Sequence, residues 1–143
     1  MQVRALMATD LATVGPNDSL QTAVDVMLER AIGSVIVCDV QHTPLGIVTK
    51  SDVLRAASEV GKPLDEIGVS PVMSQPLETI RPTATVQTAL NRLAEAGIKR
   101  LVIVDDMELI GIVTMTDIAL HLPEEVSEVR HTERHREEWT EED

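Results

Sequence analysis

The sequence predicts an α+β fold built from two copies of one unit, each with the order strand, helix, strand, strand, helix. The segment LIGIVTMTDIAL at 109–120 repeats the segment LGIVTKSDVL at 45–54. Identical residues continue through both halves at an offset of 66 residues, beginning with the pair Met7 and Met73. The offset falls by one before the second glycine, as a deletion in a loop would produce. Repetition of this kind is typical of a duplicated structural unit.

Turn signals and apolar runs define the first helix and the sheet of the first half. Residues 12–14 look like a short strand that ends at a Gly-Pro turn. Asp18 then has the position of a helix N-cap, with Gln21 at capping-box spacing. The β-branched run 34–40 predicts a buried strand, which pairs as a hairpin with a strand at 45–48.

A second helix ends the first half. Its predicted N-cap is Ser51 or Asp52, and it stops at the Gly-Lys-Pro sequence 61–63. The apolar residues expected to face inward are Val53, Leu54 and Ala57. Residues 61–72 contain several helix-breaking residues and are predicted to be a linker, so the first unit spans 1–60.

The second half repeats this order over residues 73–122. The expected elements are a strand at 78–80, a helix at 85–96, strands at 100–104 and 109–113, and a helix from Asp117. The remaining segment, 123–143, has high charge and few apolar residues. It is predicted to be a solvated acidic tail.

The composition restricts the classes of function. The formal net charge is −12, and half of it lies between His121 and Asp143. Such a surface argues against direct binding of nucleic acid or anionic membranes, because phosphate groups would be repelled. One tryptophan with no phenylalanine or tyrosine also argues against stacking on single-stranded bases, and it predicts an aliphatic core.

Simple sequence patterns argue against a membrane span, a secretion signal, a metal site and an active site. No apolar run approaches the roughly 18 residues of a membrane-spanning helix and no signal-peptide pattern is present, so a cytoplasmic location is expected. The single cysteine, Cys38, fits a buried core position. His131 and His135 have helical spacing but lack a third ligand, so no metal is expected. No catalytic constellation or Gly-rich phosphate loop appears, which indicates that the chain is not an enzyme.

The repeated motifs resemble the tandem CBS domain pair, or Bateman module. They are the signatures GIVTKSD at 46–52 and GIVTMTD at 111–117, and the lead-ins MATDLATVGP at 7–16 and MSQPLETIRP at 73–82. The resemblance implies two βαββα CBS repeats that pack through their sheets about a pseudo-twofold axis and leave two clefts at their junction. It also implies adenosyl ligands (AMP, ADP, ATP or S-adenosylmethionine) in those clefts, a regulatory role and a homodimer.

The signature carries the predicted ligand contacts. Asp52 and Asp117 stand three residues past a threonine and present carboxylates that can accept from both ribose hydroxyls. The hydroxyl groups predicted to bond ribose or phosphate oxygens, at a helix N-terminus that favours anions, belong to Thr49, Ser51, Thr114 and Thr116. The same pattern is also a good helix N-cap, so a purely structural role for either aspartate stays open.

Adenine needs an apolar slot with backbone groups at its edge. The residues that resemble such a slot by position are Ile32, Val35, Ile98 and Leu101. Lys99 and Arg100 follow in the second half, where the first half has Gly33 and Ser34. The cleft served by Lys99 and Arg100 is therefore predicted to handle phosphates better, unless these two are ordinary surface charges.

Together these features predict a stand-alone regulatory module with no catalytic cofactor. It would bind an adenosyl ligand between two CBS repeats and signal occupancy to an unknown protein partner by a population shift. The alternative is a CBS-type dimerisation or interaction module with degenerate, unoccupied ligand sites. Stabilisation by a ligand separates the two, because a ligand that binds only the native state raises its stability.

Overall fold

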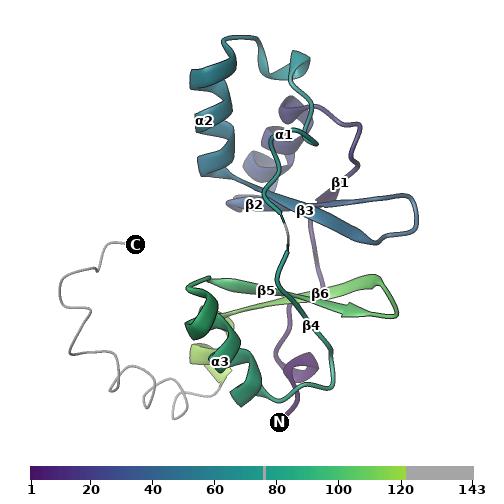
Figure 1. Ribbon diagram of the computed structural model, residues 1–143, viewed down its shortest axis with the longest axis vertical. Helices are drawn as coiled ribbons and strands as arrows, with labels where there is room; N and C mark the ends of the chain where they lie inside the picture. The colour runs from purple at the N-terminus through teal and green to yellow at the C-terminus, as the bar shows by residue number, and fades with distance from the viewer. Residues whose placement is uncertain (76, 122–143) are drawn as a thin grey trace, which may run out of the picture.

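The computed structural model describes residues 1–75 and 77–121 and shows two similar halves stacked along the long axis (Figure 1). The first half contains β1 (Thr13–Val14), α1 (Leu20–Arg30), β2 (Ser34–Cys38), β3 (Pro44–Thr49) and α2 (Lys50–Val60). The second contains β4 (Thr79–Ile80), α3 (Val86–Ala96), β5 (Arg100–Asp105), β6 (Glu108–Thr114) and α4 (Met115–His121). The predicted α+β fold with two βαββα repeats is confirmed.

Each repeat has a three-stranded mixed sheet, in the order β1-β2-β3 or β4-β5-β6. The first two strands of each sheet run parallel, and the second and third form an antiparallel hairpin. The β5–β6 hairpin turns at Asp106 and Met107, with φ angles of 54° and 69°. Two successive residues at positive φ are typical of a type I′ turn, whose twist matches that of the flanking strands.

Three aliphatic clusters hold the fold together, one inside each repeat and one between the sheets. Successive side chains of a strand point to opposite faces. On β2, Val35 and Val37 therefore enter the core of the first repeat, whereas Ile36 packs against Val102 of the second repeat. Figure 1 shows the consequence, because the two sheets face each other and the helices lie on the outer sides.

Each repeat is completed by the segment that precedes the other repeat. Val3, in the short 3-10 helix η1 (Val3–Ala5), and Leu6, directly after it, are buried in the core of the second repeat. Ile67 and Val69, after the 3-10 helix η2 (Leu64–Glu66), are buried in the core of the first repeat. Part of the predicted linker 61–72 therefore has a packed structure and supplies core residues.

We call these two stretches, residues 3–12 and 67–75, the crossed segments. Each of them packs a methionine against a signature glycine of the other repeat. A Cβ on Gly46 would lie 2.7 Å from Sδ of Met73 and 3.0 Å from the carbonyl oxygen of Ser74. A Cβ on Gly111 would lie 2.5 Å from Sδ of Met7. Separations this short require the neighbour to move, so glycine permits the close approach of each segment to its strand.

Gly46→Ala is expected to lower the free energy of unfolding by about 1–3 kcal/mol through overpacking. Its methyl group would meet a backbone oxygen as well as the flexible Met73 side chain. Gly111→Ala is the matched control, because its three nearest contacts are with the Met7 side chain, whose Sδ and Cγ can rotate away, and include no backbone atom. Urea unfolding followed by circular dichroism measures both losses, and equal losses would contradict the role of the Ser74 carbonyl.

Both predicted N-caps in the first repeat were wrong. The N-cap of α1 is Ser19, whose hydroxyl accepts from the backbone N–H of Thr22 at 3.2 Å. Asp18 instead accepts from the backbone N–H of Gly15 at 2.8 Å and closes the preceding turn. The N-cap of α2 is Thr49, since the strand runs directly into the helix and its last residue takes that position.

The inward face of α2 was also partly mispredicted. Leu54 is 71% exposed and Ala57 is exposed, whereas Ala56 is buried and Val53 is half-buried. The inner face of the helix instead includes Asp52 and Ala56, four residues apart. Within residues 1–75 and 77–121, no helix is long and apolar enough to cross a membrane. The predicted acidic tail, with His131 and His135, lies outside the described residues.

Candidate ligand-binding site

Asp52 is the only charged side chain that is buried in the described part of the chain, at 5% exposure. It closes a capping box with Thr49, whose backbone N–H donates to Oδ2 at 2.8 Å and whose hydroxyl donates at 3.0 Å. The Ser74 hydroxyl lies 3.2 and 3.3 Å from the two carboxylate oxygens. Nη1 of Arg55 lies 3.3 Å from Oδ1. The Asp52 carboxylate is therefore held by donors from three residues.

Asp117 occupies the same position in the second repeat with fewer partners. The backbone N–H of Thr114 donates to its Oδ2 at 2.9 Å, and its own N–H donates to the Thr114 hydroxyl at 3.0 Å. Within the described residues, no side chain from another segment donates to this carboxylate. One carboxylate oxygen of Asp117 thus keeps its capacity to accept from a ligand.

The polar ends of the hairpins face the junction of the two repeats. Ser34 pairs with Thr49 across β2 and β3, and Arg100 pairs with Thr114 across β5 and β6. Side chains alternate along a strand, and the residues two positions beyond Ser34 and Arg100 are buried between the sheets. All four polar residues therefore lie on the sheet faces that meet at the junction.

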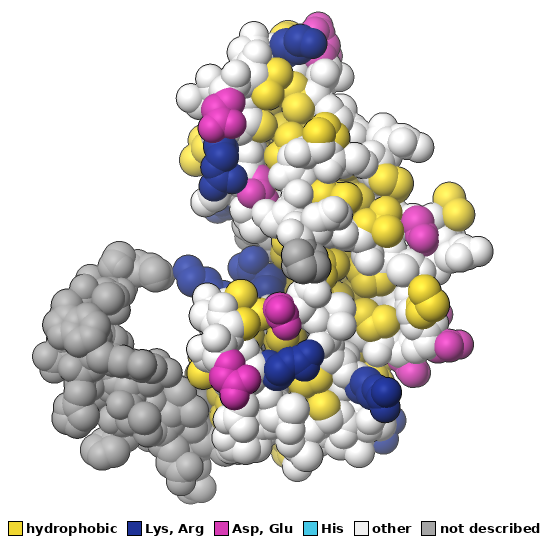
Figure 2. All heavy atoms as spheres, viewed as in Figure 1, with side chains coloured by type: hydrophobic (Ala, Val, Ile, Leu, Met, Phe, Trp, Pro, Cys, Tyr) yellow, Lys and Arg dark blue, Asp and Glu magenta, His cyan; other side chains and the backbone are white. Residues whose placement is uncertain are grey.

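The crossed segments decide which polar ends lie near which carboxylate. The segment that begins at Ser74, bonded to Asp52, reaches the second repeat four residues later, where the Glu78 carbonyl accepts from the backbone N–H of Val102 at 3.0 Å. This contact brings the start of β5, and with it Arg100, to the side of Asp52. Figure 2 shows Lys and Arg side chains on this face close to where the halves meet.

The second crossed segment makes the complementary connection. Ala8 forms a β-bridge with β6, next to the strand end that precedes Asp117. Four residues later, the Ala12 carbonyl accepts from the backbone N–H of Ile36 at 3.1 Å. Ser34, at the start of β2, is therefore brought to the side of Asp117. Each side of the junction thus combines a carboxylate of one repeat with a strand start of the other.

The predicted apolar slot is divided between half-buried and fully buried residues. Ile32 and Ile98 are half-buried at the ends of the loops that follow α1 and α3. Val35 and Leu101 are 1% and 0% exposed and belong to the cores of their own repeats. Neither of these two side chains presents surface to the junction, because each lies on the opposite face of its sheet.

A hollow of about 450 Å³ opens beside Asp52, between α2 and the segment 62–72. The charged residues of its lining are Asp52, Arg55, Glu59, Lys62 and Glu66. This volume lies within the range of small-molecule sites. The other predicted contacts, Ser51, Thr116 and Lys99, are exposed.

Catalytic or metal chemistry finds little basis among the described residues. Burial, with a smaller contribution from the charge of Asp39, raises the pKa of the Cys38 thiol to about 11, so the thiol stays protonated and unreactive near neutral pH. No group of three or more His, Cys, Asp or Glu side chains within residues 1–75 and 77–121 is placed to hold a metal ion.

The class of protein follows from two features of the structure. The two pseudo-symmetric repeats are joined face to face through their sheets, and each has a carboxylate at its strand-to-helix junction. The chain belongs to the CBS domain family, because the family model matches residues 3–59 and 69–124. The predicted tandem CBS pair is therefore confirmed.

Known relatives agree with this assignment. The CBS domain-containing protein YhcV of Bacillus subtilis is 33% identical over 83% of this chain and 84% of its own length. An uncharacterised protein of Methanopyrus kandleri is 38% identical over 76% of this chain, which spans 56% of that relative. The solved structure of CBSX2 in complex with AMP matches 86% of this chain and 96% of its own, at 26% identity with a TM-score of 0.74.

Two partners of Asp52 were missed by sequence reasoning. Arg55 follows Asp52 by three residues on a helix, a spacing that places side chains on one face and that was available as a signal. Ser74 stands 22 residues away in the crossed segment, and no local pattern indicates that it meets Asp52.

Proposed function

We propose that this protein is a regulatory module that binds an adenosyl ligand at the junction of its two CBS repeats and signals occupancy to a protein partner. The observation that carries the proposal is the pair of carboxylates, Asp52 and Asp117, held at strand-to-helix junctions beside polar strand ends. Vicinal ribose hydroxyls are donors that a carboxylate accepts. The AMP complex of the related CBSX2 supports an adenosyl ligand.

Arg100 supports a preference for phosphate on the side of Asp52. Its side chain is half-buried at the start of β5 and faces the junction, whereas Ser34 has the equivalent position on the side of Asp117. A guanidinium group binds phosphate oxygens in a bidentate manner, which a serine hydroxyl does not match. The phosphate-preferring cleft of this proposal is thus the one that contains Asp52.

A thermal-unfolding panel tests the proposed function. AMP, ADP, ATP, S-adenosylmethionine, NAD and GTP are compared at equal concentration in low and high salt, since the chain carries a net charge of −12. A saturable rise in melting temperature with one adenosyl compound is expected, about 2.7 kcal/mol of stabilisation at 100 times Kd. A folded protein that responds to none of them would refute adenosyl binding and favour the interaction module.

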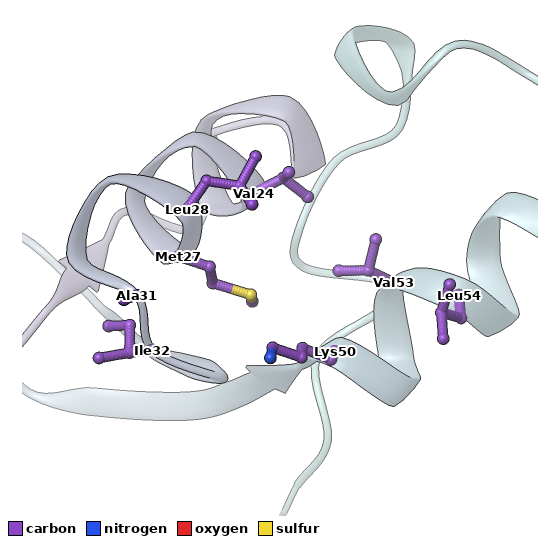
Figure 3. A pocket seen from close by; sticks show the side chains of 8 residues that line it. All are labelled: Val24, Met27, Leu28, Ala31, Ile32, Lys50, Val53 and Leu54. Carbon is purple, nitrogen blue, oxygen red and sulfur yellow. The ribbon is translucent and has the colours of Figure 1, made fainter.

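An apolar groove on the first repeat favours a homodimer as a second property. Figure 3 shows its side chains, which come from α1, from the loop that follows it and from α2. The groove has a volume of about 510 Å³. Leu28 and Leu54 on its rim are 75% and 71% exposed. In the second repeat, the equivalents of the groove residues Met27 and Val53 are Leu93 and Ile118, at 1% and 0% exposure.

A second copy of the chain is the occupant we propose for this groove. An isologous contact would place Leu28 and Leu54 of each copy against the same surface of the other, so that both patches are buried at once. Exposed apolar side chains that cluster on one face are typical of such interfaces.

Leu54→Lys is expected to shift the protein from dimer to monomer in size-exclusion chromatography with light scattering. The weakening should be about tenfold or more, since burying one leucine contributes about 1.5–3 kcal/mol. Val40→Lys is the matched control, because Val40 is also exposed but lies in the β2–β3 turn away from the groove. A wild-type protein that is monomeric, or a Leu54 variant that remains dimeric, would contradict this interface.

A further inference from the structure

The two signature carboxylates differ in the side chains that hold them. Asp52 accepts from the Ser74 hydroxyl, at 3.2 and 3.3 Å, and from Arg55, at 3.3 Å. The residues at the equivalent positions around Asp117 are Ala8 and Leu120, whose side chains carry no hydrogen-bond donor. Both repeats therefore keep the carboxylate, but they differ in the side chains that a ligand must displace to reach it.

We propose that Ser74 and Arg55 set the ligand specificity of the Asp52 cleft. This cleft selects a nucleotide, which carries phosphate as well as ribose hydroxyls, over the neutral nucleoside, whereas the Asp117 cleft accepts both. The inference rests on the adenosyl-binding function proposed above and adds the class of ligand that each cleft takes.

The Ser74 contact explains the discrimination against a nucleoside. A ribose that bonds Asp52 must displace the Ser74 hydroxyl, so one neutral donor replaces another and little affinity is gained. The displaced Ser74 hydroxyl belongs to the segment that bridges to Ile47 of β3, so its loss also loosens that segment. At Asp117, a ribose adds a contact to an oxygen for which no side chain within residues 1–75 and 77–121 competes.

The Arg55 contact explains why phosphate restores affinity. The Arg55 side chain is 60% exposed and is held to Asp52 by one ion pair at 3.3 Å. An ion pair open to solvent is weak and readily exchanged. Arg55 and Asp52 line the same hollow of about 450 Å³, together with Lys62, Glu59 and Glu66, so a phosphate must stay close to the two cations, where it can take the guanidinium while the ribose takes the carboxylate. Arg100 on the same side adds to this preference.

The full-length chain tests this by calorimetric titration with adenosine and AMP. Asp117→Ala isolates the Asp52 cleft, and Ser74→Ala and Arg55→Leu are made in that background to copy the environment of Asp117. Asp52→Asn isolates the Asp117 cleft, because asparagine keeps an acceptor oxygen for the cap. Ala8→Ser in that second background is the matched control, which introduces a hydroxyl where Ser74 stands in the other cleft. Circular dichroism verifies that every variant is folded.

In the isolated Asp52 cleft, AMP is expected to bind at least about tenfold more tightly than adenosine, given the strength of charge-assisted phosphate contacts. Ser74→Ala should raise the affinity for adenosine about threefold to tenfold, the effect of one competing hydrogen bond. Arg55→Leu should lower the affinity for AMP about fivefold or more, and it should not lower the affinity for adenosine, because it also removes a donor that competes for the Asp52 carboxylate. Ala8→Ser should lower the affinity of the Asp117 cleft for adenosine.

The possible failures are distinguishable. The proposed function is wrong if neither compound binds the wild-type protein. It is also wrong if Asp52→Asn and Asp117→Ala each keep the wild-type affinity and the wild-type number of binding sites. The specificity roles of Ser74 and Arg55 are then wrong as well. If binding depends on these aspartates but the ratio of AMP to adenosine affinity is the same with and without Ser74 and Arg55, only the specificity inference is overturned. In that case the two residues serve the helix N-terminus alone.

Discussion

Leu101→Ala should lower the free energy of unfolding by about 2–5 kcal/mol, the range for truncating a large buried aliphatic residue. Leu101 is 0% exposed and lies in the core of the second repeat, with Leu90, Leu93 and Ile118 around it. No aromatic side chain is present in this core to fill the vacated volume. Urea unfolding followed by circular dichroism measures the loss.

Ile98→Ala is the control, since Ile98 is half-buried three residues earlier and packs only at the margin of the same core. Its truncation should cost about 1 kcal/mol and, under the proposed function, should weaken adenosyl binding. If Leu101→Ala kept wild-type stability but lost ligand affinity, Leu101 would belong to the adenine slot, and its assignment to the core would be wrong.

Much of the fold was predictable because duplication doubles each local signal. The signatures at 46–52 and 111–117 each mark a strand that runs into a helix, and the structure has both. The errors were local. At the start of α2, three polar residues compete for one N-cap, and only the geometry of the strand end decides for Thr49. The inward face was mispredicted as well, because Leu54 is exposed while Asp52 and Ala56 are buried.

The candidate site was less predictable because its parts come from segments far apart in the chain. Asp52 was identified from the signature alone, but its contact with Ser74 depends on the crossed segment that completes the first repeat. The sequence feature that comes closest to indicating these crossed segments is the repeated methionine of the lead-ins, because each methionine packs against a signature glycine. The sequence also does not show which core a buried residue enters. Val35 and Ile36 are both β-branched, but Val35 lies in the core of the first repeat and Ile36 lies between the sheets.

Asp117→Ala should weaken binding of an adenosyl ligand by about 1–3 kcal/mol, the usual loss when a charged hydrogen-bond partner is removed. One oxygen of the Asp117 carboxylate accepts from the backbone N–H of Thr114, and no donor in the described part of the chain bonds to the other oxygen. The variant should keep its fold, because the Thr114 hydroxyl can still accept the backbone N–H of residue 117. Calorimetric titration and thermal unfolding of the same sample measure both quantities.

Asp52→Ala is the matched comparison and should lower the stability of the fold as well as the affinity for the ligand. Removing this carboxylate takes the acceptor from Thr49, Ser74 and Arg55 at once, so the free energy of unfolding should fall by about 1–2 kcal/mol, as for a lost helix cap. If Asp117→Ala destabilises the fold as much and leaves ligand affinity unchanged, then Asp117 is a cap as well. If only Asp117→Ala costs affinity, Asp52 serves chiefly the fold, which would contradict the ligand contact proposed for the Asp52 cleft.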